Sequence, residues 1–300
     1  MNNKKLPTAY CLLPTAYCLL LLFGCRERID ITTDNAVPQL VITGYVTTDT
    51  MAHIITIAQT MGYFGTETPK TYDNAVVTIN GEPLHALGAG RYATDEDFFG
   101  EPGKTYLLEA YIDKDNNGNP QYYTASTTMP PMHVLDSITL RFFRNDHHGE
   151  PAWAIYVNFR DVPNVPNLFG AHLYVNSEKY SNKLRRYFLN FFDESAADGQ
   201  YIRFFTYILR HEMRWDIEEH FFKIYTGDTL TLEFNMLDRT YFNYIQAAKA
   251  EVSGSNPVFA GPPANVPCNI QGGALGIFGA YTTSRKSLII TDKYGFPIRN

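Results

Sequence analysis

Hydrophobic and polar residues alternate in short runs over the first half of the chain. Period-two alternation among β-branched and aromatic residues is typical of β-strands, and Asn80-Gly81 is a two-residue hairpin signal. About seven short strands without a helical pattern predict an immunoglobulin-like β-sandwich over residues 38–128. The runs are separated by Gly, Pro or Asn and cover residues 39–48, 53–58, 75–80, 83–87, 90–94, 105–112 and 121–128.

A second β-rich segment, residues 134–300, follows the proline pair Pro130-Pro131, which is typical of a boundary. One helix is expected near residues 239–252, because an apolar stripe has the i, i+3, i+4, i+7 spacing and Asp238 can cap the first turn. The stripe consists of Tyr241, Tyr244, Ile245 and Ala248, and the predicted strands cover 136–143, 152–159, 173–176, 228–235, 274–281 and 285–292. The pattern therefore predicts a mainly β fold with one helix.

Residues 1–24 have the order of a secretory signal, with Lys4 and Lys5 before an apolar stretch and the small Gly24 at its end. The final residues, Leu22-Phe23-Gly24-Cys25, resemble a bacterial lipobox. In that class of signals the peptidase cuts before the cysteine, which then carries the lipid. We expect a lipid-anchored protein of the cell envelope, in the outer membrane, held to the membrane through lipidated Cys25.

Two alternatives to this lipid anchor remain open. An ordinary secretory signal with an incidental cysteine would have the same order, whereas Pro7 and Pro14 argue against a permanent membrane-spanning helix. The heptapeptide at 6–12 is repeated at 13–19, which leaves the true start codon unsettled. After Cys25, the polar residues up to position 37 are expected to form a tether.

Composition narrows the function classes. The chain has 45% hydrophobic and 19% charged residues, enough apolar content for folded cores. Its net charge of −6 becomes −8 once residues 1–24 are removed, so a broad basic surface for nucleic acid is not expected. With Cys25 lipidated, Cys268 would be the only other cysteine of the mature chain, which excludes an internal disulfide framework.

One segment resembles part of a calcium-binding loop. Asp113, Asp115 and Asn117 match the first half of the D-x-D-x-N-G pattern, whose oxygens can surround a hard cation. The twelfth position is Thr124, where such a loop needs a bidentate Glu, and the flanking segments are predicted strands. A solvated hairpin turn is therefore favoured over Ca²⁺, and no other cofactor is expected. The chain also lacks a nucleophile elbow, a Walker loop and a dinucleotide fingerprint.

Aromatic residues are concentrated between positions 180 and 225, where they are interleaved with arginines. Adjacent Phe-Phe pairs at 191–192, 204–205 and 221–222 cannot both face one core in a strand. Half of these residues are expected in a β-core, and the others in a ligand or partner patch. The candidates for that patch are Tyr187, Phe192, Tyr201, Phe205, Tyr207 and Trp215.

Several motifs resemble those of the Bacteroidetes lipoprotein family catalogued as domain of unknown function 4249. They are Leu40-Val-Ile-Thr-Gly-Tyr-Val, Asn74-Ala-Val-Val-Thr-Ile, Gly100-Glu-Pro-Gly-Lys-Thr-Tyr, Met129-Pro-Pro, Thr226-Gly-Asp-Thr-Leu, Tyr241-Phe-Asn-Tyr, Asn256-Pro-Val-Phe and the run from Pro262 to Tyr281. The resemblance covers most of residues 25–292. It implies a cell-envelope lipoprotein that works beside a TonB-dependent outer-membrane receptor, and it supplies no catalytic residues.

Two functions from different classes are compatible with these features. The preferred one is a non-enzymatic accessory or ligand-binding subunit of a TonB-dependent receptor. The alternative is a surface hydrolase acting on glycan or peptide, which would need paired carboxylates in a cleft. Its candidate carboxylates are Asp193, Glu194, Asp216, Glu218 and Glu219.

Overall fold

The computed structural model describes residues 37–61, 68–115, 117–144, 151–181, 183–192, 198–210, 212–213, 222–252 and 266–299. Strands dominate these residues, with one α-helix, α3 (Arg239–Val252), and two short 3-10 helices, η1 (Leu184–Arg186) and η2 (Asp292–Tyr294). The mainly β fold and the helix near 239–252 are thus confirmed. No helix in the described part of the chain has both the length and the apolarity for a membrane crossing.

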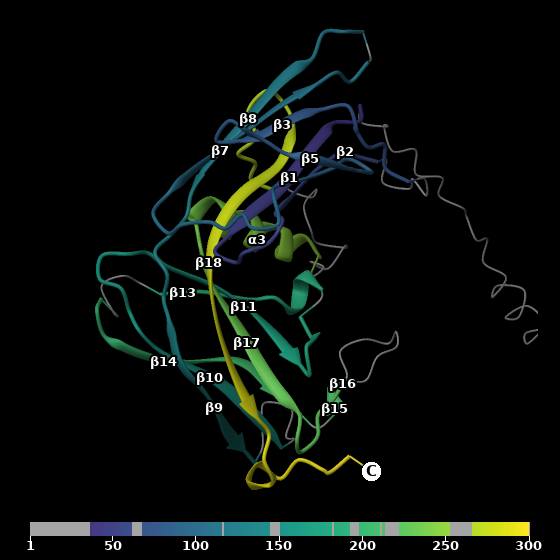
Figure 1. The fold of residues 1–300 in the computed structure, drawn as a ribbon. Coiled ribbons are helices and arrows are strands. Elements are labelled where there is room, and N and C mark those ends of the chain that lie inside the picture. Colours follow the sequence, from purple (N-terminus) through teal and green to yellow (C-terminus); the bar gives the residue numbers. More distant parts are fainter. Residues whose placement is uncertain are drawn as a thin grey trace, which may run out of the picture. The chain divides into compact units, whose positions relative to one another are not determined.

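The longest strand, β18 (Leu275–Ile289), belongs to both halves of the fold (Figure 1). Its first residues pair in parallel with β1 (Leu40–Thr47), and its later residues pair antiparallel with β17 (Thr229–Leu237). Two separate strands were expected at 274–281 and 285–292. Thr282 and Ser284 instead continue one strand, because they pair with Met236 and Phe234 of β17.

A nine-stranded sheet is built around β18, in the order β12-β11-β17-β18-β1-β2-β6-β5, with β13 also paired to β11. Two smaller sheets pack against it, in the orders β4-β3-β7-β8 and β14-β10-β9, and β15 pairs with β16. The strands not yet delimited are β2 (Ile54–Gln59), β3 (Val76–Ile79), β4 (Glu82–Pro83), β5 (His85–Gly88), β6 (Arg91–Ala93), β7 (Thr105–Ile112), β8 (Gln121–Thr128), β9 (Leu135–Phe143), β10 (Ala152–Arg160), β11 (Asn167–Val175), β12 (Glu178–Lys179), β13 (Phe188–Phe192), β14 (Tyr201–Leu209), β15 (Glu212–Met213) and β16 (Phe222–Lys223).

The first core lies between β1, β2 and β6 on one side and β3, β7 and β8 on the other. Its fully buried side chains include Ile42, Ile55, Tyr106 and Phe278. Phe278 comes from β18, so residues near the C-terminus complete the core that the sequence assigned to 38–128. The division of the chain into 38–128 and 134–300 stays a prediction.

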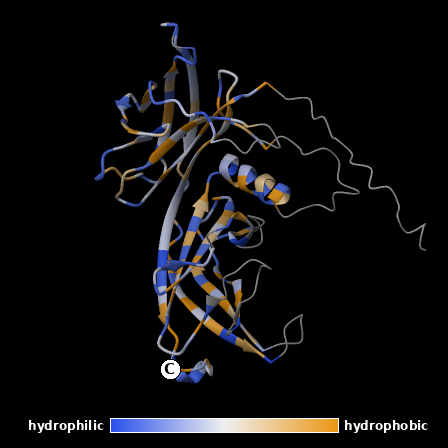
Figure 2. Cartoon of the chain, turned by 90° about the vertical axis from the view of Figure 1, so that its right-hand side faces the viewer, coloured by the Kyte–Doolittle hydropathy of each residue, from blue (hydrophilic) through white to orange (hydrophobic). Residues whose placement is uncertain are grey.

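The second core lies between β11, β17 and the end of β18 on one side and β9, β10 and β14 on the other. The rings of Phe159, Phe169 and Phe234 pack at its centre, with centroids 4.9 to 5.3 Å apart. Alternation of hydrophilic and hydrophobic residues along the strands (Figure 2) gives each sheet one face for the core and one face away from it.

The adjacent pair Phe204-Phe205 behaves as the alternation predicts. The Phe204 ring packs 6.0 Å from Phe159 and 5.8 Å from Phe169 in the second core. Phe205 points the other way and is 52% exposed. The side chains of the pairs at 191–192 and 221–222 lie outside the described residues.

Helix α3 begins with the predicted cap. The Asp238 carboxylate accepts hydrogen bonds from the backbone N–H groups of Thr240 (2.8 Å) and Tyr241 (3.0 Å). Its second oxygen accepts from the backbone N–H of Ala280 in β18 (3.0 Å), which fixes the helix start to the sheet. Phe242 and Ile245 are the buried residues of the helix. Ile245 belongs to the predicted stripe, whereas Phe242 was missed, and the predicted Tyr241 and Tyr244 pack partly buried at the margin.

Candidate functional site

The predicted aromatic patch divides between core and surface. Tyr187 and Tyr207 are 6% and 8% exposed, so they are core residues and the surface prediction is wrong for both. The Tyr207 hydroxyl lies 2.6 Å from the carbonyl oxygen of Ala171, which explains how a buried tyrosine satisfies its polar atom. Tyr201 and Phe205 are more than half exposed on the outer face of β14.

Other predicted residues fall where the structure gives no side-chain position. Cys25, Trp215 and the side chain of Phe192 lie outside the described residues. The same holds for the carboxylates proposed for a hydrolase, Asp193, Glu194, Asp216, Glu218 and Glu219. Lipidation of Cys25 and the hydrolase carboxylates therefore stay predictions.

The candidate calcium ligands lie in the hairpin between β7 and β8. The Asp113 carboxylate accepts hydrogen bonds from the backbone N–H groups of Asn117 (3.1 Å) and Gly118 (2.7 Å), four and five residues farther along the loop. Asp115 and Asn117 are exposed. Across the described ranges, no cluster of three or more His, Cys, Asp or Glu side chains is placed for a metal ion. Calcium binding here stays a prediction.

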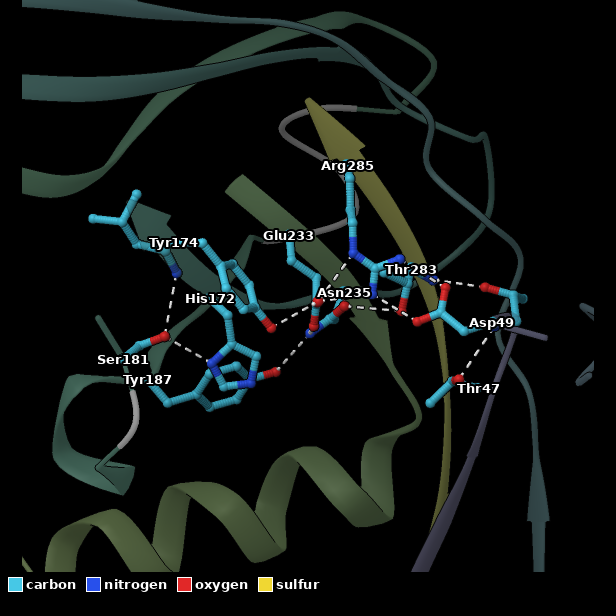
Figure 3. Close-up of polar contacts among 12 residues, drawn as sticks. Thr47, Asp49, His172, Tyr174, Ser181, Tyr187, Glu233, Asn235, Thr283 and Arg285 are labelled. Atoms are coloured by element: carbon cyan, nitrogen blue, oxygen red, sulfur yellow. Dashed lines mark hydrogen bonds and ion pairs between the residues drawn. The ribbon is translucent and has the colours of Figure 1, made fainter. Parts of the chain in front are cut away.

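A polar network that sequence reasoning missed occupies the outer face of the nine-stranded sheet (Figure 3). The strand register places His172 of β11 opposite Glu233 of β17, and Glu233 opposite Arg285 of β18. In the neighbouring row, Asn235 lies opposite Thr283. Residues two apart in a strand share a face, so both rows point away from the second core.

Arg285 is the centre of this network. Its guanidinium forms a bidentate ion pair with Asp49, in the turn after β1, at 2.7 and 2.6 Å. Its Nε and Nη2 also donate to one oxygen of Glu233, at 3.1 and 2.7 Å. The side chains of Arg285 and Asp49 are 43% and 29% exposed, whereas that of Glu233 is 9% exposed. The guanidinium therefore joins the turn after β1 to β17.

Neutral partners extend the network toward helix α3. The hydroxyls of Tyr174 and Thr283 donate to Glu233 (3.1 Å) and Asn235 (3.1 Å), respectively. The Tyr187 ring lies against His172, with centroids 4.3 Å apart. A Cβ at position 170 would collide with the Tyr187 hydroxyl, so this close approach requires Gly170.

A cluster of three tyrosines lies where α3 packs on the same face of the sheet, with one ring from the helix and two from strands. The rings of Tyr241 in α3 and Tyr281 in β18 are stacked, 5.7 Å apart and inclined by 6°. Tyr45 of β1 lies 5.4 Å from Tyr281 and 6.2 Å from Tyr241, and 45% of it is exposed. The cluster thus ends in one aromatic ring that solvent can reach.

An open cavity of about 430 Å³ adjoins this tyrosine cluster, a size found among small-molecule sites. None of its lining residues is an Asp, Glu, Lys or Arg. It offers tyrosine and threonine hydroxyls and the His53 imidazole beside apolar side chains. The main lining residues are Thr43, Tyr45, Met51, Ile54, Tyr241 and Tyr244. We call it the tyrosine pocket.

Burial fixes the protonation states around the network. It raises the pKa of the Tyr187, Tyr241 and Tyr281 hydroxyls well above their ordinary value, so they remain protonated. It lowers the pKa of His172 to about 3, so this imidazole is neutral. The hydrogen bonds from Arg285 lower the pKa of Asp49. These groups act as fixed donors and acceptors, whereas a general acid or base needs a pKa near the working pH.

The neutral state of His172 predicts acid sensitivity. Its pKa is about 6.5 in an unfolded chain and about 3 in the fold, so the unfolded state binds more protons between these values. Its contribution to stability is complete above pH 6.5 and is lost as the pH falls toward 3. Between pH 6 and 4, the free energy of unfolding of wild type should fall more steeply than that of His172→Gln, by about 1.4 kcal/mol per pH unit.

Denaturant titrations at several pH values measure this difference in slope. The matched control is His85→Gln, because His85 is exposed and pairs with the exposed Asp95. This control should retain the wild-type slope. Equal slopes for wild type and His172→Gln would contradict the prediction.

The comparisons with known proteins give one positive finding. The family described as "Domain of unknown function (DUF4249)" matches residues 26–287. No curated protein and no solved structure matches the chain. The matched range contains Asp49, Glu233 and Arg285, and every residue that lines the tyrosine pocket. Because the match covers most of the sequence, the chain belongs to the DUF4249 family.

Proposed function

We propose that this protein is a non-enzymatic lipoprotein of the cell envelope that serves a TonB-dependent outer-membrane receptor as an accessory or ligand-binding subunit. The observation that carries the binding role is the tyrosine pocket, which combines an exposed aromatic ring, neutral hydroxyls and an open cavity of about 430 Å³. Small-molecule sites have this combination of apolar walls and few polar groups.

The groups around the pocket support binding in preference to chemistry. The nearby tyrosines are held protonated, burial lowers the pKa of the His53 imidazole that lines the pocket, and hydrogen bonds from Arg285 lower the pKa of the Asp49 carboxyl. A glycoside hydrolase would need a carboxylic acid with a raised pKa beside a carboxylate base or nucleophile. The Asp49, Arg285 and Glu233 cluster has the opposite character, since the central guanidinium stabilises the ionised form of the Asp49 carboxylate.

The membrane anchor of the proposal rests on the sequence. Leu22-Phe23-Gly24-Cys25 follows an apolar stretch and precedes a polar tether, the order expected of a lipoprotein signal. A cysteine bearing two or more acyl chains would anchor the chain stably, whereas a single chain binds a membrane only marginally. The pocket would then be tethered at the membrane surface, where a receptor could receive its ligand.

Affinity purification from native membranes tests the proposal. The full chain, tagged at its C-terminus and extracted in mild detergent, should retain a TonB-dependent β-barrel receptor identifiable by mass spectrometry. The matched control is Cys25→Ser, which should lose a metabolically incorporated acyl label and leave the membrane fraction. Recovery of wild type without any receptor barrel would refute the accessory role. Hydrolytic turnover that one carboxylate substitution abolishes would replace the proposal with the hydrolase alternative.

A further inference from the structure

A second surface, separate from the tyrosine pocket, lies on the outer face of the β14-β10-β9 sheet. The strand register places Tyr201 opposite Arg160, Arg203 opposite Asn158, and Phe205 opposite Tyr156. The intervening residues Ile155, Val157 and Phe159 point into the second core. The side chains that define this Arg-aromatic face are Arg141, Tyr156, Arg160, Tyr201, Arg203 and Phe205.

Two arginines of this face lie over aromatic rings. The Arg203 guanidinium is 4.7 Å from the centroid of Tyr156, and that of Arg141 is 5.3 Å from the centroid of Phe143. A guanidinium over an aromatic ring still has N–H groups that can donate to other partners. Among the residues that the structure describes, none accepts a hydrogen bond from Arg141 or Arg203.

Charge on these strands contrasts with that of the whole chain. β9, β10 and β14 contain three arginines and one carboxylate, Asp136, whereas the chain has a net charge of −6. At physiological salt, interactions between exposed charges are screened beyond about 8 Å. The three strands of this face therefore carry a net positive charge, although the chain as a whole is acidic.

The exposed rings restrict the anion to a ligand with apolar surface. Tyr201 and Phe205 are 57% and 52% exposed and alternate with Arg203 along β14. Sugar rings present C–H faces that stack on aromatic rings, and acidic sugars carry carboxylate or sulfate groups that match guanidinium N–H donors. We propose that the Arg-aromatic face binds an extended anionic polysaccharide, independently of the receptor proposal.

The dimensions of the face favour a polymer strand over a folded partner. Three strands spaced about 4.8 Å apart and nine residues long at about 3.3 Å per residue cover on the order of 400 Å². A stable protein interface buries about 800 Å² on each partner. A twofold dimer through this face would also bring two arginine-bearing surfaces together, which like-charge repulsion disfavours. A strip of this size suits one extended chain.

Binding measurements with defined polymers test this inference. The full chain should bind dextran sulfate and not neutral dextran of the same length. Triple substitution Arg141→Gln, Arg160→Gln, Arg203→Gln should weaken dextran sulfate binding at least tenfold. The matched control removes three exposed positive charges elsewhere, through Arg91→Gln, Lys104→Gln and Lys286→Gln, and should change binding less than twofold. Thermal unfolding verifies that each variant is folded.

The aromatic contribution separates a polysaccharide from an acidic polypeptide. Double substitution Tyr201→Ser, Phe205→Ser should weaken dextran sulfate binding about fivefold and leave poly-L-glutamate binding unchanged. If poly-L-glutamate binds as tightly as dextran sulfate and the aromatic variant binds both normally, the occupant is an acidic polypeptide. Equal weakening by the arginine triple and its control would assign binding to net charge and overturn the inference.

Discussion

Replacing Arg285 with methionine should lower the free energy of unfolding by about 2 to 3 kcal/mol. The substitution keeps an unbranched chain of similar length but leaves Glu233, with a side chain 9% exposed, without its cationic partner. Removal of one partner from a fully buried ion pair costs about 3 to 5 kcal/mol. The expected value is smaller because the Arg285 side chain is 43% exposed and water screens part of the interaction.

A double-mutant cycle identifies the uncompensated carboxylate as the cause. Arg285→Met combined with Glu233→Gln should be more stable than Arg285→Met alone, because no buried charge is left behind. Lys104→Met serves as the matched control, since it breaks the exposed pair with Glu101 and should cost less than about 1 kcal/mol. Urea unfolding monitored by tryptophan fluorescence measures wild type and four variants, which are Arg285→Met, Glu233→Gln, their combination and Lys104→Met. A loss for Arg285→Met no larger than that of the control would contradict the prediction.

The sequence predicted features that depend on neighbouring residues. The strand pattern, the helix near 239–252 and its cap by Asp238 all follow from periodicity and local hydrogen bonding. The opposite orientations of Phe204 and Phe205 follow from the two-residue period of a strand. Such features need no knowledge of which distant segments meet.

Features that depend on distant pairing were missed. Asp49 and Arg285 are separated by 236 residues and meet only because β18 lies beside β1 in the sheet. A signal was present in the alternation, since Glu233 and Asn235 in β17 and Thr283 and Arg285 in β18 place polar groups two apart within strands. The register between β17 and β18 brings these polar pairs side by side into one network. The sequence alone does not give that register.

The polar run Thr282-Thr283-Ser284 shows the same limitation. It lies between the two strands that the sequence predicted at 274–281 and 285–292. In the fold, β17 supplies the backbone partners and Asn235 accepts a hydrogen bond from Thr283. Tertiary pairing therefore overrides a local preference, as is common for β-structure. The uninterrupted strand is what joins the first core to the second.

Gly276→Ala should be the most destabilising glycine-to-alanine substitution in β18. We expect it to lower the free energy of unfolding by more than about 3 kcal/mol. Gly276 has φ of +117°, which alanine adopts only with strain. An added Cβ would also collide with the carbonyl oxygen of Ile42, the residue opposite it in β1. Relief would require β1 and β18 to separate, because the collision is with backbone.

Gly273→Ala isolates the collision from the backbone strain. Gly273 has φ of +84°, but an added Cβ there would meet no atom within 4 Å. The free energy of unfolding of Gly273→Ala should fall only by the cost of the backbone strain, about 1 to 2 kcal/mol. Urea unfolding measures both variants, and for a Gly276→Ala chain that does not fold, the yield of soluble protein relative to Gly273→Ala gives the same comparison. Equal stability of the two variants would show that β1 and β18 are not held together at this position, and the close parallel pairing at the centre of the large sheet would then be wrong.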